Sequence, residues 1–167
     1  MAKLSILRYP SPLIRKKSLP VTAIDGDLQQ FIDDMVETMY AAPGVGLAAP
    51  QVGALKQVIV LDAHDDRGPS RPLTLINPQL VDVNGQIMEE EGCLCIPDLR
   101  EEVPRFKQVT VKAYDRKERE MILEASDLLA RILQHEIDHL NGVLFIDRLS
   151  AAKRELIKRR LKKAQKE

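Results

Sequence analysis

The chain contains two stretches in which apolar residues follow helical spacing, and a long region of short strand-like runs lies between them. In the first stretch, the apolar residues recur at intervals of three and four positions: Leu28, Phe31, Ile32, Met35, Val36 and Met39. This spacing is typical of an amphipathic helix, which Asp25 would open and Pro43 would end. The second stretch, from Ser126 to Gly142, is apolar on more than one face. It predicts a central, largely buried helix with Ser126 as its N-cap and Gly142 as its stop.

The region between these helices favours β-structure. Four short runs have the apolar and β-branched composition of strands: residues 58–61, 73–76, 109–114 and 121–123. Asn84-Gly85 lies between two further runs and is the dipeptide typical of a two-residue hairpin. The order of helix, strands and helix predicts an α+β fold, in which mixed or antiparallel sheets pack around the helix at 126–142. The helix that begins at Asp25 is the N-terminal helix of this fold, residues 1–24 before it are expected to be an irregular arm, and a further helix is expected at the C-terminus.

The composition is that of a globular protein and argues against membrane-spanning and secreted classes of protein. Of the 167 residues, 44% are hydrophobic and 30% are charged, and the formal net charge is zero. No apolar run approaches the length of a membrane span, and the N-terminus lacks the apolar core of a signal peptide. We therefore expect a cytoplasmic protein with no membrane association. The two cysteines, Cys93 and Cys95, are too close for an ordinary disulfide, so at least one is expected to be a metal ligand.

The central helix carries two of the three histidines of the chain, His135 and His139, with Glu136 directly after the first. Residues four apart lie on one helical face, so both imidazoles can bind one metal ion while Glu136 lies beside it. The alternative is a pair of surface histidines on an amphipathic helix. The pattern H-E-x-x-H within an apolar run favours the metal site.

A third protein ligand is required, because a catalytic site of the zinc type has three protein ligands and one position open for water. The three-histidine peptidase pattern fails, since Phe145 stands where its last histidine would be. Glu155 lies in a basic stretch and His64 in a polar loop, and both are more typical of the surface. Cys93, which follows Gly92, is the strongest candidate, with a small buried apolar cysteine as the alternative.

Three separated segments resemble the signature motifs of peptide deformylases of the bacterial type. Residues 44–51 read G-V-G-L-A-A-P-Q, residues 91–94 read E-G-C-L, and residues 135–139 read H-E-I-D-H. The order and spacing of the motifs agree with the family. One position departs from it, because Cys95 stands where the family has a serine after E-G-C-L. We expect Cys95 to be a small buried residue, and a second thiol close to the metal is the alternative.

The resemblance implies an enzyme that removes the N-formyl group from the initiator methionine of nascent polypeptides and releases formate. The metal ligands that it implies are Cys93, His135 and His139. They would hold one divalent ion per chain, with Fe(II) expected natively and Zn(II), Ni(II) or Co(II) as alternatives. Glu136 would act as general base and then as general acid. Gln51 and the backbone N–H of Leu94 would donate hydrogen bonds to the oxyanion.

The substrate implied by the resemblance is an N-formylmethionyl peptide. The candidates for its apolar methionine pocket are Val45, Leu94, Leu128 and Ile132. The glycines that would let its backbone pair as an added strand are Gly44, Gly46 and Gly92. Each apolar candidate has plain core packing as its alternative. Arg131 would lie at the rim of the pocket, without an assigned role.

The end of the sequence is a basic tail. Residues 151–167 contain eight Lys and Arg against two Glu, with a thin apolar stripe. We divide the chain into residues 1–149, a single metal-dependent catalytic domain, and residues 150–167, a basic helical tail. The resemblance implies that this tail contacts ribosomal RNA, and a solvated or frayed helix is the alternative.

Two other functions compete with the deformylase hypothesis. A gluzincin-like endopeptidase requires a downstream glutamate ligand, for which Glu155 is a weak candidate. A non-catalytic RNA-binding module would use the metal as a structural ion and the tail as its working surface. A purely structural metal site, however, requires neither Glu136 nor Gln51.

Overall fold

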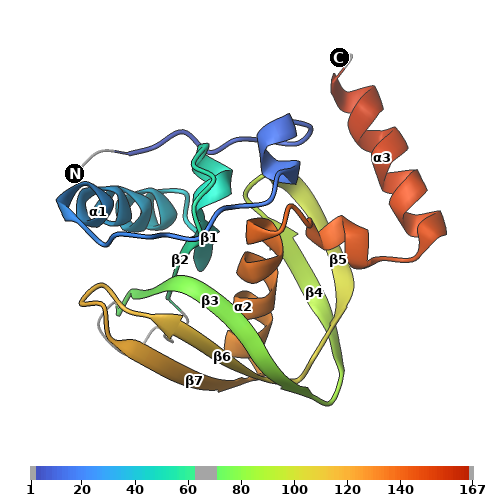
Figure 1. Ribbon diagram of the computed structural model, residues 1–167. Coiled ribbons are helices and arrows are strands. Elements are labelled where there is room, and N and C mark those ends of the chain that lie inside the picture. The colour runs from blue at the N-terminus through green and yellow to red at the C-terminus, as the bar shows by residue number, and fades with distance from the viewer. Residues whose placement is uncertain (1–2, 63–70, 166–167) are drawn as a thin grey trace.

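The computed structural model describes residues 3–62 and 71–165 and has an α+β architecture, which confirms the predicted fold class (Figure 1). The α-helices of this part of the chain are α1 (Gly26–Ala41), α2 (Asp127–Leu140) and α3 (Ala151–Gln165). Its short 3₁₀-helices are η1 (Pro12–Arg15), η2 (Ala49–Val52) and η3 (Phe145–Arg148). His64 lies outside the described residues.

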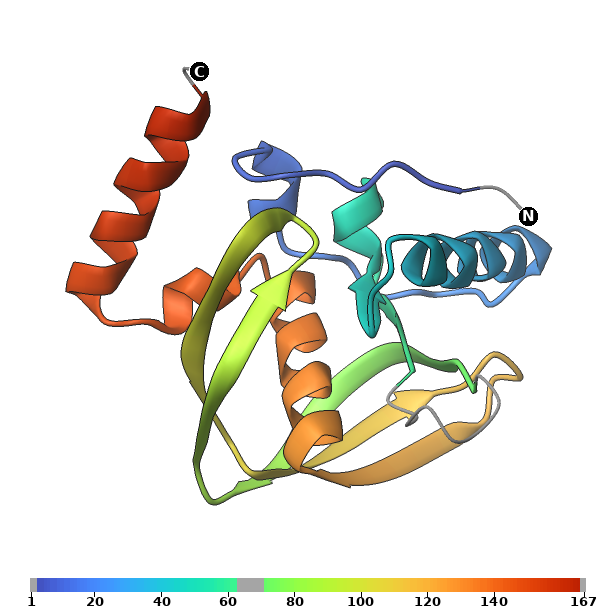
Figure 2. The same cartoon turned by 180° about the vertical axis from the view of Figure 1, so that it is seen from behind.

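The strands of the described residues form two antiparallel sheets. The larger sheet has the order β1 (Gly46–Ala48), β2 (Val58–Leu61), β3 (Leu73–Asn84), β6 (Gln108–Tyr114) and β7 (Glu120–Ser126). The smaller sheet pairs β4 (Ile87–Cys93) with β5 (Ile96–Arg105). Helix α2 lies between the two sheets, as the views from opposite sides show (Figures 1 and 2). The helix that carries both histidines is therefore central, as the sequence predicts.

The predicted hairpin at Asn84-Gly85 is wrong. These residues join β3 to β4, but β3 pairs with β6 and β4 pairs with β5, so the connection passes from one sheet to the other. Gly85 does have a positive φ of 68°, as a tight turn requires. The turn chemistry is thus present, whereas the choice of strand partner depends on distant residues. Strand β5 does not follow from the sequence pattern, because its apolar residues are interrupted by two prolines and several charged residues.

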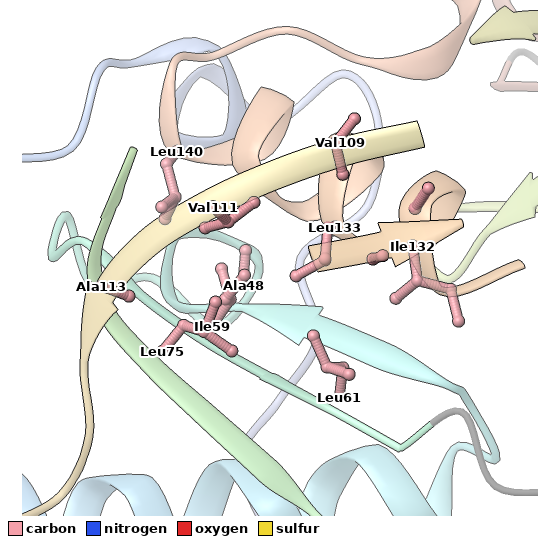
Figure 3. Close-up of a cluster of buried hydrophobic side chains, with 12 residues drawn as sticks. Ala48, Ile59, Leu61, Leu75, Val109, Val111, Ala113, Ile132, Leu133 and Leu140 are labelled. Atoms are coloured by element: carbon pink, nitrogen blue, oxygen red, sulfur yellow. The ribbon is translucent and has the colours of Figure 1, made fainter. Parts of the chain in front are cut away.

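An aliphatic core joins α2 to the larger sheet (Figure 3). The labelled side chains of this core come from α2 and from β1, β2, β3 and β6: Ala48, Ile59, Leu61, Leu75, Val109, Val111, Ala113, Ile132, Leu133 and Leu140. Each fully buried Leu or Ile is worth about 1.5–3 kcal/mol relative to an exposed one, so this face fixes the position of α2. The lack of aromatic residues in the cluster agrees with their scarcity in the sequence.

A second core covers the smaller sheet and η3. It contains Cys95, Ile96 and Val103 from the β4–β5 region and Phe145 and Ile146 from η3. Helix α2 therefore has packed residues on both sides, and most of its side chains from Ala130 onward are buried. This burial confirms the expectation of a largely buried helix.

The ends of the helices follow the predicted signals. The side chain of Asp25 accepts a hydrogen bond from the backbone N of Leu28 at 2.9 Å and so caps α1. Helix α2 begins after Ser126, although the Ser126 hydroxyl makes no capping bond. Gly142 follows the end of α2 with a φ of +75°, and a Cβ there would lie 2.3 Å from the carbonyl oxygen of Arg15. Only glycine fits this position.

An N-terminal arm, residues 3–24, lies against the segments that carry the three sequence motifs. Its backbone donates three hydrogen bonds to them or to their neighbours: Leu7 N to Gln51 O (2.7 Å), Tyr9 N to Cys95 O (2.8 Å) and Ser18 N to Leu140 O (2.8 Å). Each bond ends on a different segment, since Gln51 is in η2, Cys95 follows β4 and Leu140 ends α2. The arm therefore ties together the backbone segments that carry the motifs.

Helix α3 stands at the edge of the molecule, and its far end projects away from the sheets in both views (Figures 1 and 2). Ile157 is buried against the second core and Leu161 is partly buried, so the thin apolar stripe attaches the helix. Among the described helices, none combines the length and the apolar composition that a membrane crossing would need.

Candidate metal centre

Three side chains from two elements converge at the end of β4. The Sγ atom of Cys93 lies 3.2 Å from Nε2 of His139, and this nitrogen lies 3.2 Å from Nε2 of His135. The three possible ligand atoms all lie within 4.8 Å of one another. Donors around a tetrahedral cation with ordinary bond lengths would be about 3.3–3.6 Å apart. The donor set therefore fits one divalent cation with little movement.

Glu91 fixes the orientation of His135. Its Oε1 lies 2.9 Å from Nδ1 of His135, and its carboxylate also accepts hydrogen bonds from Nε (2.8 Å) and Nη2 (3.0 Å) of Arg105. Burial raises the pKa of the Glu91 carboxyl, but the hydrogen bonds from His135 and Arg105 outweigh burial and lower this pKa to about 2. A carboxylate at this position makes Nδ1 the donor, which leaves the Nε2 lone pair of His135 directed at the cluster.

Arg105 connects the two elements that supply the ligands. Besides Glu91 of β4, it binds Asp138 of α2, with Nη1 2.6 Å from Oδ2. Its side chain is only 3% exposed, so both ion pairs are shielded from water. Asp138 also accepts a hydrogen bond from Nη2 of Arg148 at 2.6 Å. This charge network contacts the ligand His135 through Glu91 and joins the smaller sheet to α2.

Glu136 occupies a buried position beside the ligands. Its Oε1 has no hydrogen-bond partner among the described residues, and burial raises the pKa of Glu136 to about 7. A Cβ at Gly46 would lie 2.6 Å from its other oxygen, Oε2, so β1 can pass this close only with glycine there. A buried carboxyl group with one oxygen unpartnered among the described residues is suited to exchange a proton with a bound molecule.

Gln51 presents its amide nitrogen to the centre. Its Oε1 accepts a hydrogen bond from the backbone N of Ala48 at 2.8 Å, so the other end of the amide is the donor. That donor, Nε2, lies 3.6 Å from Sγ of Cys93. Leu94 is in the turn that follows Cys93 and joins β4 to β5. Gln51, Cys93 and Leu94 all line one cavity.

Cys95 is fully buried, as expected, and lies outside the group of possible ligands. Its Sγ is 3.1 Å from Sγ of Cys93. Without a cation, the protonated Cys93 can donate this hydrogen bond, which together with burial raises the pKa of its thiol. Burial lowers the pKa of His135, but its hydrogen bonds with Cys93 and Glu91 outweigh burial and raise it. Binding of a cation to Cys93 and His135 must therefore release protons.

A cavity of about 990 Å³ opens beside the cluster. The residues that the sequence proposes for substrate binding all line it: Gly44, Val45, Gly46, Gly92, Leu94, Leu128 and Ile132. Cys93, Gln51, His135 and Glu136 line the same cavity. Arg131 is part of the wall, where its Nη2 lies 3.6 Å from Oε2 of Glu89.

Roles for Glu91, Arg105 and Asp138 do not follow from the sequence. Glu91 and Arg105 stand among other charged residues, so the sequence does not show which charges are buried or which of them meet. Phe145, which stands where a three-histidine peptidase would have its last ligand, is buried and stacks on His135 with ring centroids 6.1 Å apart. Glu155 lies on α3 and is not part of the cluster.

Comparisons with known proteins agree over nearly the whole chain. The family described as polypeptide deformylase matches residues 3–155. A peptide deformylase of Thermodesulfovibrio yellowstonii is 49% identical over 162 residues, which cover 97% of this chain and 98% of the relative. A crystal structure of a peptide deformylase from Legionella pneumophila has a TM-score of 0.90 at 43% identity and covers 99% of this chain and 96% of that one.

A second solved structure matches equally well. The peptide deformylase from Ehrlichia chaffeensis in complex with actinonin has a TM-score of 0.92 at 36% identity, with full coverage of both chains. Since the sequence motifs, the fold and the metal-ligand cluster all agree with these proteins, this chain belongs to the polypeptide deformylase family.

Proposed function

We propose that this chain hydrolyses the formyl group of N-formylmethionyl peptides, with Cys93, His135 and His139 holding one divalent cation. Water adds to the formyl carbon, the C–N bond breaks, and the products are formate and a free amine. The observation that carries the proposal is the carboxyl group of Glu136. It is buried, it lacks a partner for Oε1 among the described residues, and it lines the same cavity as two of the ligands.

The native cation that we propose is Fe(II), one ion per chain. A donor set of one thiolate and two imidazoles accepts iron, zinc, nickel or cobalt, so the choice between them rests on availability in the cell. When bound, such a cation supplies a Lewis acid and lets water ionise at about pH 7.

Glu136 moves the proton in this mechanism. It takes a proton from the attacking water and later gives it to the nitrogen that leaves, so one carboxyl group acts as base and then as acid. Its buried position excludes bulk water from the exchange. Gly46 leaves room for the carboxyl group beside β1, because a side chain at that position would occupy the space of Oε2.

Gln51 and Leu94 stabilise the negative charge that develops on the formyl oxygen. The amide of Gln51 is oriented before substrate binds, since its Oε1 is already bound to the backbone of Ala48. The backbone N–H of Leu94 is the second donor that we propose. Preoriented donors of this kind contribute about a hundredfold or more each to the rate.

The cavity provides the site for the methionine end of the substrate. Val45, Leu128 and Ile132 line it together with Leu94 and form the apolar pocket that we propose for the methionine side chain. Gly44, Gly46 and Gly92 present backbone in the same wall, where an extended peptide can pair as an added strand. The competing endopeptidase would need a glutamate ligand, and among the described residues the cluster contains none.

We also propose that the chain acts in the cytoplasm, close to the ribosome, with residues 1–149 as the catalytic domain and residues 150–167 as a basic tail. The support is the exposed basic surface of α3. Four of its exposed residues are Arg159, Arg160, Lys162 and Lys163. A positive helix of this kind attracts the phosphate backbone of RNA.

Replacing Glu136 by Gln keeps the volume of the side chain but removes its ability to carry the proton. We expect this variant to retain its cation and to release formate from a formyl-Met-Ala peptide at least about a hundredfold more slowly. Formate production and elemental analysis of the same sample measure the two effects. Full turnover by a metal-loaded Glu136→Gln protein would remove this residue from the mechanism.

Replacing Glu91 by Gln removes the negative charge that orients His135. We expect cation affinity to fall about 10- to 100-fold, as is usual when the partner of a ligating histidine is changed. Titration with a competing chelator measures the affinity, after circular dichroism has shown that the variant folds. Glu90→Gln is the matched control, because Glu90 is exposed and binds Arg100 instead of the centre. Equal affinities for both variants would contradict the role of Glu91.

The ligand assignment separates the two cysteines. Cys93→Ala should lose nearly all bound metal, whereas Cys95→Ser should retain one ion per chain, because only Cys93 belongs to the convergent donor set. Elemental analysis of protein purified without oxygen measures the content and also identifies the native ion. The reverse pattern would transfer the ligand role to Cys95.

The tail hypothesis is tested by neutralising charge without removing the helix, because Ile157 is part of the core. The four exposed basic residues of α3 named above are changed to Gln. We expect weaker, less salt-dependent ribosome binding in a sedimentation assay, with unchanged hydrolysis of short peptides. The control neutralises four exposed lysines outside α3: Lys16, Lys17, Lys107 and Lys117. An equal loss of binding in both proteins would show general electrostatics, not a tail site.

A further inference from the structure

Cys95 makes a close contact that the proposed mechanism does not use. Its side chain is fully buried, and its Sγ lies 3.1 Å from Sγ of Cys93. At this distance the two sulfur atoms are in hydrogen-bond contact, and by geometry alone either of them could be the donor.

The direction of this hydrogen bond follows from the chemistry of the ligand. A cysteine that binds a cation is deprotonated and can only accept. Cys95 is not part of the convergent group of donors, so it keeps a proton to donate. Of the two sulfurs, the donor is therefore Cys95 and the acceptor is Cys93.

Packing holds the donor in place. The backbone oxygen of Cys95 accepts a hydrogen bond from Tyr9 N at 2.8 Å, and its side chain belongs to the core that includes Ile96, Val103 and Phe145. Apart from the ligand His139, the Cys93 sulfur also has Nε2 of Gln51 within 3.6 Å. Cys95 makes a closer contact than Gln51, and its side chain is enclosed by this core.

We propose that Cys95 is a positioning residue of the metal centre, whose S–H group donates to the sulfur of Cys93 and limits how much charge this sulfur gives to the cation. Hydrogen bonds to a ligating sulfur tune the electronic properties of the metal that it binds. The inference rests on the proposed ligation by Cys93. It gives the residue that departs from the serine of the family a defined chemical role.

The test uses the full chain loaded with Co(II), whose thiolate-to-cobalt charge-transfer absorption reports the electron density on Cys93. Cys95→Ala removes the donor, so the sulfur becomes more electron-rich and the band should move to longer wavelength than in the unchanged protein. Cys95→Ser supplies a stronger donor, since S–H is a weak one, and the band should move to shorter wavelength. Opposite shifts are a signature that loss of packing alone does not produce.

A matched control separates packing from hydrogen bonding. Ile96→Val removes one methyl group from the buried neighbour of Cys95 and leaves both sulfurs unchanged. We expect its band to coincide with that of the unchanged protein. If Cys95→Ala does not fold, the sign of the shift in Cys95→Ser against Ile96→Val still decides the question.

Two kinds of outcome would overturn the inference. Unshifted bands, or shifts of the same sign in both Cys95 variants, would show that the contact is packing only. Loss of cobalt from both variants would make Cys95 a ligand instead of a donor. Absence of any thiolate-to-cobalt band in the unchanged protein would instead refute ligation by Cys93, and with it the proposed function.

Discussion

Arg105 binds the carboxylates of Glu91 and Asp138 in a buried site, and this double ion pair determines whether the metal ligands meet. Cys93 belongs to a two-stranded sheet that shares no strand pairing with the larger sheet, whereas both histidines belong to α2. Apolar packing between these bodies is non-directional. The guanidinium fixes their relative position, because loss of one partner leaves a buried charge uncompensated at a cost of about 3–5 kcal/mol. Glu91, held by Arg105, in turn fixes the orientation of the imidazole of His135 through a hydrogen bond.

Two buried glutamates near the centre behave in opposite ways because their partners differ. Hydrogen bonds from His135 and Arg105 lower the pKa of Glu91 to about 2, whereas burial without such partners raises the pKa of Glu136 to about 7. The first carboxylate stays charged and orients a ligand. The second can gain and lose a proton within the neutral range. Separation of a structural and a reactive carboxylate by environment is a general way to obtain acid–base chemistry from one residue type.

The parts of the structure that follow from local patterns are those that the sequence predicts well. Helical spacing located α1 and α2, and the four-residue interval placed His135 and His139 on one face. Pairing between distant segments was harder to predict. The Asn84-Gly85 turn joins two sheets instead of forming a hairpin, and Arg105 meets Glu91 and Asp138 across 14 and 33 positions. The contact between Cys95 and Cys93 was also hard to predict. It depends on the turn that joins β4 to β5, and β5 has no clear apolar alternation from which this turn could be located.

The N-terminal arm has a consequence for the order in which the molecule forms. Its backbone donates hydrogen bonds to Gln51, Cys95 and Leu140. The arm also passes so close to Gly142 that a side chain there would collide with the backbone of Arg15. The arm can therefore take its final position only after α2, which lies far later in the chain, has formed. Contacts of such long sequence separation slow folding. The catalytic cluster is accordingly completed late, so that a partly made copy of the enzyme carries the early motifs without a finished centre.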